Sequence, residues 1–200
     1  MAIQTFTSGQ VLTAAQLNTL QQQAVMTFTN EAARDAALTS PTEGMVAYLT
    51  APTVPAATGT TTSLPTGIIT IYNGTVWVCI TSVGTSSSGA SNNFTTSYAD
   101  MTIAGAVSSV TLVTGTTALV SYAGRINGNG NFAALSVKTG TVAASDNWSV
   151  YNQVSGYVTV GRSFVMTGLT AGTNTFTLQG KNNVAGANCD QVSLNVQGIA

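Results

Sequence analysis

The sequence predicts a mainly β protein with a short N-terminal helical segment, a small β-hairpin module and a C-terminal antiparallel β-sandwich of jelly-roll type. The first observation is the alternation of apolar and polar residues in Thr175–Gln179 and Gln191–Gln197, which gives each segment one apolar face. The second is the pair Gly168 and Gly172, which suits a tight turn between strands. The third is composition, because threonine, a strand-favouring residue, supplies 34 of 200 residues. Strands with one apolar face need a second sheet to cover them, which predicts a sandwich.

The first element expected is a helix over Ala14–Met26. Thr13 and Gln16 have the spacing of a capping box, in which each side chain satisfies an unpaired backbone amide of the first turn. Leu12 and Leu17 stand at the two positions of a hydrophobic staple. The helix then presents an apolar stripe on one face, formed by Leu17, Leu20 and Ala24.

A helix of about three turns is marginal in water on its own, so its leucines need a surface to pack on. Either that surface belongs to the same chain, or the helix self-associates or docks on a partner. Residues 1–43 are therefore expected to form an attachment or oligomerisation segment. A second short helix is predicted over Asn30–Leu38, with Glu31 and Arg34 as a weak ion pair one turn apart. Pro41 ends it, because a residue that precedes proline disfavours the helical conformation. The candidate attachment residues are Leu12, Leu17, Leu20 and Ala24.

Residues 44–81 are expected to form the small β module. Met45–Leu49 is predicted as a strand, and the Pro- and Thr-rich stretch Thr50–Gly67 as an irregular loop. Ile68–Tyr72 and Thr75–Ile80 flank Asn73-Gly74, which predicts a hairpin with a type I′ turn because both residues tolerate positive φ.

Residues 82–93 have the Ser- and Gly-rich composition of a flexible linker, which places a domain boundary there. Residues 94–200 contain seven to nine short predicted strands, many of them separated by glycine or Asn-Gly turns. This spacing fits a single sandwich or jelly roll. The predicted strands are Asp100–Ile103, Ser108–Val113, Thr117–Ile126, Asn131–Lys138, Trp148–Asn152, Tyr157–Val160, Arg162–Thr167, Asn174–Gln179 and Gln191–Gln197.

The charge content is low: charged residues make up 6% of the chain and the net charge is −1. The five basic residues are scattered, so no patch is expected to bind nucleic acid. No apolar run approaches the length needed to span a bilayer, and the first residues lack a signal-peptide core, so we expect no membrane insertion and synthesis in the cytoplasm. A weakly charged chain has little electrostatic repulsion between its copies, which favours a permanent assembly.

The residues of common catalytic and metal sites are scarce. The chain has no histidine, and Cys79 and Cys189 lie too far apart in sequence to form a zinc cluster alone. They are expected to be buried free thiols, although a disulfide is the alternative. Asp146 and Asp190 are the one carboxylate pair that could be nominated for glycoside hydrolysis, and loop acids in solvent are the simpler interpretation. We therefore predict no enzyme activity, no catalytic or metal-binding residue and no cofactor.

Aromatic residues offer a different type of contact. Trp148, Tyr151 and Tyr157 fall in one strand-and-loop region and are candidates for a surface that stacks on a host-surface glycan. The alternative is that they lie in the core or at a subunit interface. Trp77 is expected to pack the hairpin.

Four stretches carry a resemblance to bacteriophage virion proteins. Phe6-Thr-Ser-Gly-Gln-Val-Leu-Thr-Ala-Ala-Gln-Leu-Asn resembles an N-terminal segment common in these proteins. Glu31-Ala-Ala-Arg-Asp-Ala-Ala, Pro41-Thr-Glu-Gly-Met-Val-Ala-Tyr-Leu and Ile71-Tyr-Asn-Gly-Thr-Val-Trp together look like a module that recurs in tail fibres and minor tail proteins. The resemblance covers roughly the first 80 residues, and this copy departs from the usual pattern in its long Pro/Thr loop. The C-terminal half resembles, in style alone, the jelly-roll domains of phage fibre and decoration proteins.

This resemblance implies a virion structural protein, on the exterior of the tail or capsid. A short tail-fibre or tail-tip protein that displays the sandwich towards the host surface is the favoured role. A capsid decoration or head-fibre protein is the alternative, and a carbohydrate-binding receptor module is a further one. The partners implied are other virion proteins and further copies of the chain, most simply in a homotrimer, because many proteins of this type are trimers.

Overall fold

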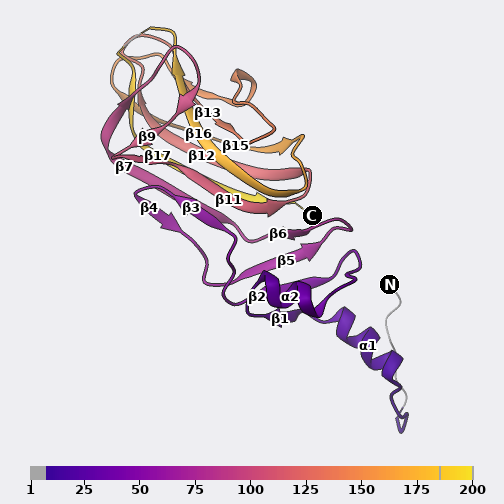
Figure 1. The fold of residues 1–200 in the computed structure, drawn as a ribbon. Helices are drawn as coiled ribbons and strands as arrows, with labels where there is room; N and C mark the ends of the chain where they lie inside the picture. Colours follow the sequence, from indigo (N-terminus) through magenta and orange to yellow (C-terminus); the bar gives the residue numbers. More distant parts are fainter. Residues whose placement is uncertain (1–7, 185, 200) are drawn as a thin grey trace.

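The structure is a computed structural model that describes residues 8–184 and 186–199. An elongated molecule emerges, with a helix projecting at one end, a small module next to it and a β-sandwich beyond (Figure 1). The mainly β fold predicted from the sequence is confirmed.

The N-terminal module combines two helices with a four-stranded sheet. The helices are α1 (Ala14–Gln23) and α2 (Glu31–Ala37). Helix α1 ends three residues before Met26, the predicted end, and Met26 begins a strand instead. The sheet has the order β1-β2-β5-β6, in which β1 runs parallel to β2 and the other pairs are antiparallel. Its strands are β1 (Met26–Phe28), β2 (Val46–Leu49), β5 (Ile68–Tyr72) and β6 (Trp77–Cys79).

The sandwich consists of two antiparallel sheets. The first sheet has the order β14-β13-β16-β11-β3, with β8 pairing a part of β16, and the second has the order β15-β12-β17-β7-β4. The short strands β9 (Thr102–Ile103) and β10 (Ala106–Val107) pair with each other, and η1 (Asp146–Trp148) is a turn of 3₁₀ helix. The remaining bounds are β3 (Ala56–Thr58), β4 (Thr61–Ser63), β7 (Val83–Asn93), β8 (Ala99–Asp100), β11 (Ser109–Thr114), β12 (Thr117–Asn127), β13 (Ala133–Lys138), β14 (Val150–Asn152), β15 (Tyr157–Thr167), β16 (Gly172–Asn182) and β17 (Asn188–Gly198).

The core lies between the two sheets, as the alternating pattern requires. In β12 every second residue from Ala118 to Ile126 is buried, and the residues between them face outward. Phe176 and Leu178 of β16 are fully buried on the facing sheet. Gly180 of the same strand leaves room for Phe94, because a Cβ at this position would lie 2.2 Å from the phenylalanine ring. Fully burying side chains of this size contributes roughly 1.5–3 kcal/mol each to folding.

The segment 82–93, expected as a flexible linker, forms strand β7 instead. This strand lies between β17 and β4 in the second sheet, so the linker prediction is wrong. Val83 faces inward and is fully buried in the core, and the next inward-facing side chain is polar but satisfied: Thr85 donates to the carbonyl oxygens of Thr58 (2.8 Å) and Thr61 (3.0 Å). The hydroxyls of Ser87 and Ser108 lie 2.8 Å apart in the interior. A Ser- and Gly-rich stretch is therefore ordered by strand pairing and polar contacts, together with the burial of Val83.

Two further predictions in the module are corrected. The stretch Thr50–Gly67 is not an irregular loop throughout, because β3 pairs with β11 and β4 pairs with β7. The hairpin between β5 and β6 is present, but its loop has four residues, Asn73–Val76, and not a type I′ turn. The Asn73 side chain accepts hydrogen bonds from the backbone amides of Thr75 and Val76, and the positive φ is at Gly74. Trp77 is buried against Tyr72 with ring centroids 5.4 Å apart, so it packs the hairpin as expected.

The position of β7 generates a test of the boundary at residue 94. A chain of residues 94–200 lacks β7, so one edge of β17 and part of the core are exposed, and we expect it to melt without cooperativity. A chain of residues 55–200 keeps β3, β4 and β7, and we expect a cooperative melt. Circular dichroism against temperature distinguishes the two. A cooperative melt of 94–200 at the midpoint of the full chain would show that β7 is dispensable.

Candidate functional site

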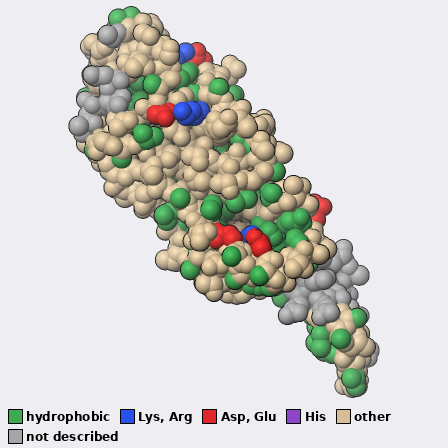
Figure 2. Space-filling view, viewed as in Figure 1, with side chains coloured by type: hydrophobic (Ala, Val, Ile, Leu, Met, Phe, Trp, Pro, Cys, Tyr) green, Lys and Arg blue, Asp and Glu red, His purple; other side chains and the backbone are tan. Residues whose placement is uncertain are grey.

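The helix α1 projects from the body, and its apolar side chains remain largely exposed (Figures 1 and 2). The exposed fractions of Leu12 and Leu17 are 39% and 50%, Leu20 is half-buried and Ala24 is exposed. Val11 beside them is 87% exposed. Of the predicted stripe, Leu17 and Leu20 lie on α1, whereas Ala24 follows its last residue, Gln23; within the described chain Leu17 stays half exposed.

The start of α1 is fixed by local hydrogen bonds. The backbone amide of Thr13 donates to Gln16 Oε1 at 3.0 Å, and the amide of Gln16 donates to Thr13 Oγ1 at 3.3 Å, so the predicted capping box is confirmed. A cap of this type contributes about 1 kcal/mol to helix stability. The helix has 10 residues, which is below the roughly 12–15 residues at which isolated helices become marginally stable in water. The cap sets where α1 begins, and a docking surface is still needed to stabilise it.

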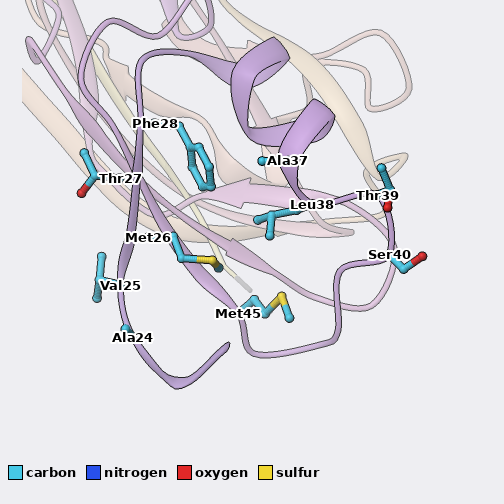
Figure 3. A pocket seen from close by; sticks show the side chains of 10 residues that line it. All are labelled: Ala24, Val25, Met26, Thr27, Phe28, Ala37, Leu38, Thr39, Ser40 and Met45. Atoms are coloured by element: carbon cyan, nitrogen blue, oxygen red, sulfur yellow. The ribbon is translucent and has the colours of Figure 1, made fainter. Parts of the chain in front are cut away.

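A groove lined by uncharged residues lies where α1 joins the module. Its volume is about 640 Å³, and it is lined by Ala24–Phe28, Ala37–Ser40 and Met45. Figure 3 shows Met26, Leu38 and Met45 pointing into the space between β1 and the end of α2. Because β1 is the edge strand of its sheet, one side of it is unpaired within the described residues. No sequence pattern predicts this groove, because its residues come from separate elements.

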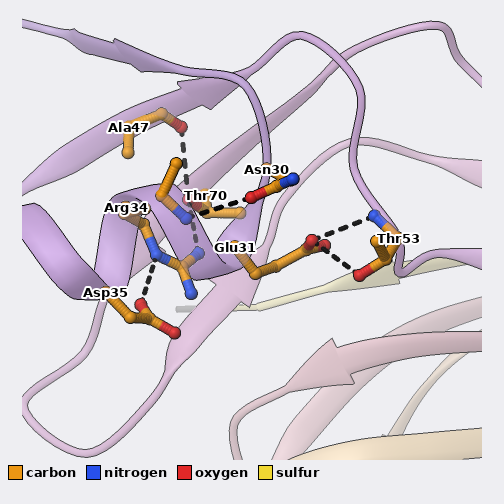
Figure 4. Close-up of polar contacts among 8 residues, drawn as sticks. Asn30, Glu31, Arg34, Asp35, Ala47, Thr53 and Thr70 are labelled. Atoms are coloured by element: carbon orange, nitrogen blue, oxygen red, sulfur yellow. Dashed lines mark hydrogen bonds and ion pairs between the residues drawn. The ribbon is translucent and has the colours of Figure 1, made fainter.

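A buried arginine holds α2 against the sheet (Figure 4). Arg34 is 5% exposed, its Nε donates to Asp35 Oδ1 at 2.9 Å, and its guanidinium lies 4.7 Å from the centroid of the Trp77 ring. Its Nη1 reaches Thr70 Oγ1 at 3.5 Å, while that hydroxyl donates to the carbonyl oxygen of Ala47 at 3.2 Å. A cation over an indole ring away from water is worth about 2 kcal/mol. This cluster fixes the wall of the groove that α2 supplies.

The sequence predicted an ion pair between Glu31 and Arg34. In the structure Glu31 instead binds the loop before β3. Its carboxylate accepts hydrogen bonds from the backbone amides of Thr53 (2.9 Å) and Val54 (3.0 Å) and from the Thr53 hydroxyl (2.8 Å). Burial opposes ionisation of this carboxyl, but the hydrogen bonds outweigh burial and lower its pKa. Helix α2 is therefore tied to the chain that leads into the sandwich.

The three aromatic residues proposed for glycan contact lie in different environments. Trp148 is half-buried, stacks on Phe164 with ring centroids 6.0 Å apart, and donates from Nε1 to the carbonyl oxygen of Val137 at 3.3 Å. Tyr151, 57% exposed, stands beside Phe132 on the first sheet. Tyr157 belongs to β15 of the second sheet. Tyr151 and Tyr157 are thus exposed on different sheets, whereas the Trp148 ring is engaged in packing on Phe164.

The two carboxylates nominated for hydrolysis also lie apart. Asp146, in η1 beside the first sheet, accepts hydrogen bonds from Lys181 Nζ at 2.6 Å and from the Tyr98 hydroxyl at 2.7 Å, and these lower its pKa. Asp190 belongs to β17 of the second sheet and pairs with Arg125. A general acid needs a carboxyl with a raised pKa, so Asp146 is poorly suited to that role.

The two cysteines are buried free thiols. Burial raises the pKa of Cys79 to about 11 and that of Cys189 to about 12, so both thiols are protonated and unreactive near neutral pH. Among the described residues, no group of three or more acidic, cysteine or histidine side chains could hold a metal ion. No helix within those same residues is both long and apolar enough to cross a bilayer.

No protein-family model matches the sequence, and no curated protein does. Among solved structures, the chain is similar to the CBM36-1 domain of a multidomain xylanase from the hindgut metagenome of Trinervitermes trinervoides. That match has 13% identity, covers 60% of this chain and 99% of the other, and has a TM-score of 0.38. The PRD1 vertex protein P5 matches at 16% identity over 56% of this chain and 89% of its own, with a TM-score of 0.34. Likenesses this distant assign no function to the chain.

The hydrogen bonds of Glu31 predict a pH-dependent stability. Because its pKa is lowered in the folded chain, its contribution is complete above the ordinary carboxyl pKa of about 4.3 and is lost as pH falls through the lowered value. Replacing Glu31 by Gln should therefore lower the free energy of unfolding by about 1 kcal/mol near pH 7 and by much less near pH 2.5. Urea titrations followed by Trp fluorescence measure both values.

Glu43→Gln serves as the matched control, because Glu43 is exposed and its side chain forms no hydrogen bond among the described residues. We expect this variant to unfold like the parent chain near pH 7. Equal losses for Glu31→Gln at both pH values would show that the carboxylate does not stabilise the loop.

Proposed function

We propose that this protein is a non-enzymatic structural component of a bacteriophage virion, in which α1 attaches the chain to its assembly and the sandwich is displayed outward. The observation that carries the proposal is the exposed leucine stripe on a capped helix that is too short to be stable alone. The resemblance of the first 80 residues to modules of phage tail fibres and minor tail proteins supports it. A short tail-fibre or tail-tip protein is the favoured role, and a capsid decoration or head-fibre protein is the alternative.

A homotrimer is the assembly that we propose. The helix α1 has no acidic residue in its first turn and no basic residue in its last, so three copies can approach without repulsion. The groove beside α1 is likewise lined by uncharged residues. A closed symmetric ring would bury the stripe of every copy at once and leave no apolar surface for further addition.

The absence of hydrolytic activity is also part of the proposal. It rests on the separation of Asp146 from Asp190 on opposite sheets and on the cation bound to each. A carbohydrate-binding role without catalysis remains compatible with this arrangement.

Assembly through α1 can be tested with Leu17→Asp combined with Leu20→Asp. Burying each leucine is worth roughly 1.5–3 kcal/mol, and a buried aspartate would add a further penalty, so we expect the variant to be absent from virions. Its sandwich should still melt as in the parent chain. The control Leu64→Asp alters a leucine that is 44% exposed and lies between β4 and β5, and it should be incorporated normally. Normal incorporation of the double variant would contradict the assignment of α1.

The oligomeric state is tested separately by light scattering. We expect three times the chain mass of 20.3 kDa at micromolar concentration and ordinary salt for the parent chain, and the monomer mass for the double leucine variant. Because apolar contacts are barely screened, the trimer mass should persist at high salt. A monomer mass for the parent chain would rule out the trimer. Antibody labelling of virions is a separate experiment, which shows whether the protein lies on the tail or on the capsid.

A further inference from the structure

A shallow trough crosses the outer face of the second sheet. The strand register places Ser86 of β7 opposite Ser193 of β17, Ser193 opposite Ala123 of β12, and Ala123 opposite Gly161 of β15. These four residues are small, and they form one row at right angles to four neighbouring strands. With strands about 4.8 Å apart, the row is about 14 Å long. We call this row and its two neighbours the sheet-face trough.

The rows on either side form the two walls of the sheet-face trough, and their larger side chains are Gln191, Arg125 and Asn195. One wall is the row Ser88, Gln191, Arg125 and Thr159, and the other is the row Gly84, Asn195, Ser121 and Ser163. Two adjoining depressions of about 290 and 300 Å³ lie along the floor and share Ala123 and Ser193. The register and the hollows thus identify the same site.

The glycines of the sheet-face trough are required by close contacts. A Cβ on Gly161 would lie 3.0 Å from the Cβ of Ala123, so a larger residue would raise the floor. A Cβ on Gly84 would lie 2.1 Å from Oδ1 of Asn195, because the asparagine side chain lies across this glycine. The depth of the trough therefore depends on specific small residues.

The walls offer polar groups that the fold does not use. Gln191 and Asn195 are exposed, and their side-chain amides form no hydrogen bond with any described residue. The hydroxyls of Ser121 and Ser163, in one wall, bond to each other at 2.7 Å, as polar side chains also do on the outer face of the first sheet. Examples are the bonds between Thr111 and Thr175 at 2.8 Å and between Gln179 and Asp100 at 2.7 Å. The amides of Gln191 and Asn195, which can both donate and accept and have no partner among the described residues, are therefore the groups of the trough that a ligand can bind.

Arg125, the charged side chain of the two walls, is paired with a carboxylate within the protein. The guanidinium of Arg125 donates to both carboxylate oxygens of Asp190 and lies 4.8 Å from the ring centroid of Tyr157. Arg162, next to Gly161 in β15, stands opposite the buried Tyr122; it has no ion pair among the described residues, and its Nη1 donates to the carbonyl oxygen of Asn147 at 2.9 Å. A phosphate or carboxylate ligand would have to compete with these contacts, so the site favours a neutral ligand.

We propose that the sheet-face trough binds a neutral glycan chain of about three sugar units. Glycan hydroxyls both donate and accept hydrogen bonds, as the side-chain amides of Gln191 and Asn195 in the walls do. A peptide strand would need an open sheet edge, and nucleic acid would need unpaired cations. The inference rests on the proposed outward display of the sandwich, because only a displayed face can meet a glycan on the host surface.

The full-length protein is screened on an array of neutral oligosaccharides of hexoses and N-acetylhexosamines, and a bound glycan is then titrated calorimetrically. Gln191→Ala combined with Asn195→Ala should weaken binding at least about tenfold, since both amides lose their contacts. Ala123→Gln should weaken binding similarly by filling the floor. Gln153→Ala, an exposed glutamine in the loop between β14 and β15, is the matched control and should bind like the parent chain.

Magnetic resonance gives a readout that does not depend on affinity. The side-chain amide signals of Gln191 and Asn195, identified by their loss in the variants, should shift when the glycan is added. No binding to any neutral glycan on the array, binding of acidic glycans only, or unchanged affinity in both trough variants would overturn the proposal. None of these outcomes bears on incorporation into virions through α1. Conversely, if the variant with Leu17→Asp and Leu20→Asp failed to assemble but still bound glycan, the trough proposal would not be affected.

Discussion

The hydrogen bonding of β7 is the interaction on which the arrangement of the whole chain depends. One edge of β7 pairs with β17, and the other pairs with β4, which comes from the N-terminal half of the chain. Thr85 ties the turn between β3 and β4 to this strand through two carbonyl oxygens. Because β3 then completes the first sheet, one short segment adds an edge strand to each sheet. The segment with β3 and β4 therefore joins the module that carries α1 to the sheet that carries the trough.

Sequence patterns predicted the sandwich well where burial follows apolar side chains. Thr117–Ile126 and Gln191–Gln197 alternate with period two, and β12 and β17 form over nearly the same residues. The pattern failed at β7, where the inward residues Thr85 and Ser87 are polar and are stabilised by partners from distant parts of the chain. No local signal in a Ser-rich stretch distinguishes such a strand from a linker, because its partners are set by the tertiary structure.

The candidate sites also differ in whether a local sequence pattern predicts them. The leucine stripe of α1 could be read from spacing, since helical periodicity is local. The glycan contact could not be placed from aromatic residues, because Trp148 is occupied in packing against Phe164. The sheet-face trough arises from register across four strands, and Ser86, Ser193, Ala123 and Gly161 are unremarkable in sequence. Only the pairing of these strands aligns them.

The scarcity of charge links the two ends of the molecule. Four of the five basic residues form ion pairs, so the remaining polar surface consists mainly of hydroxyls and amides (Figure 2). Neutral hydrogen bonds exchanged with water give modest net binding energy, so a single trough would hold a glycan weakly. In the proposed trimer, three troughs on one assembly would turn weak contacts into strong attachment to a repetitive surface, because later contacts form at high effective concentration. Assembly through α1 thereby supplies the affinity that an uncharged binding face lacks.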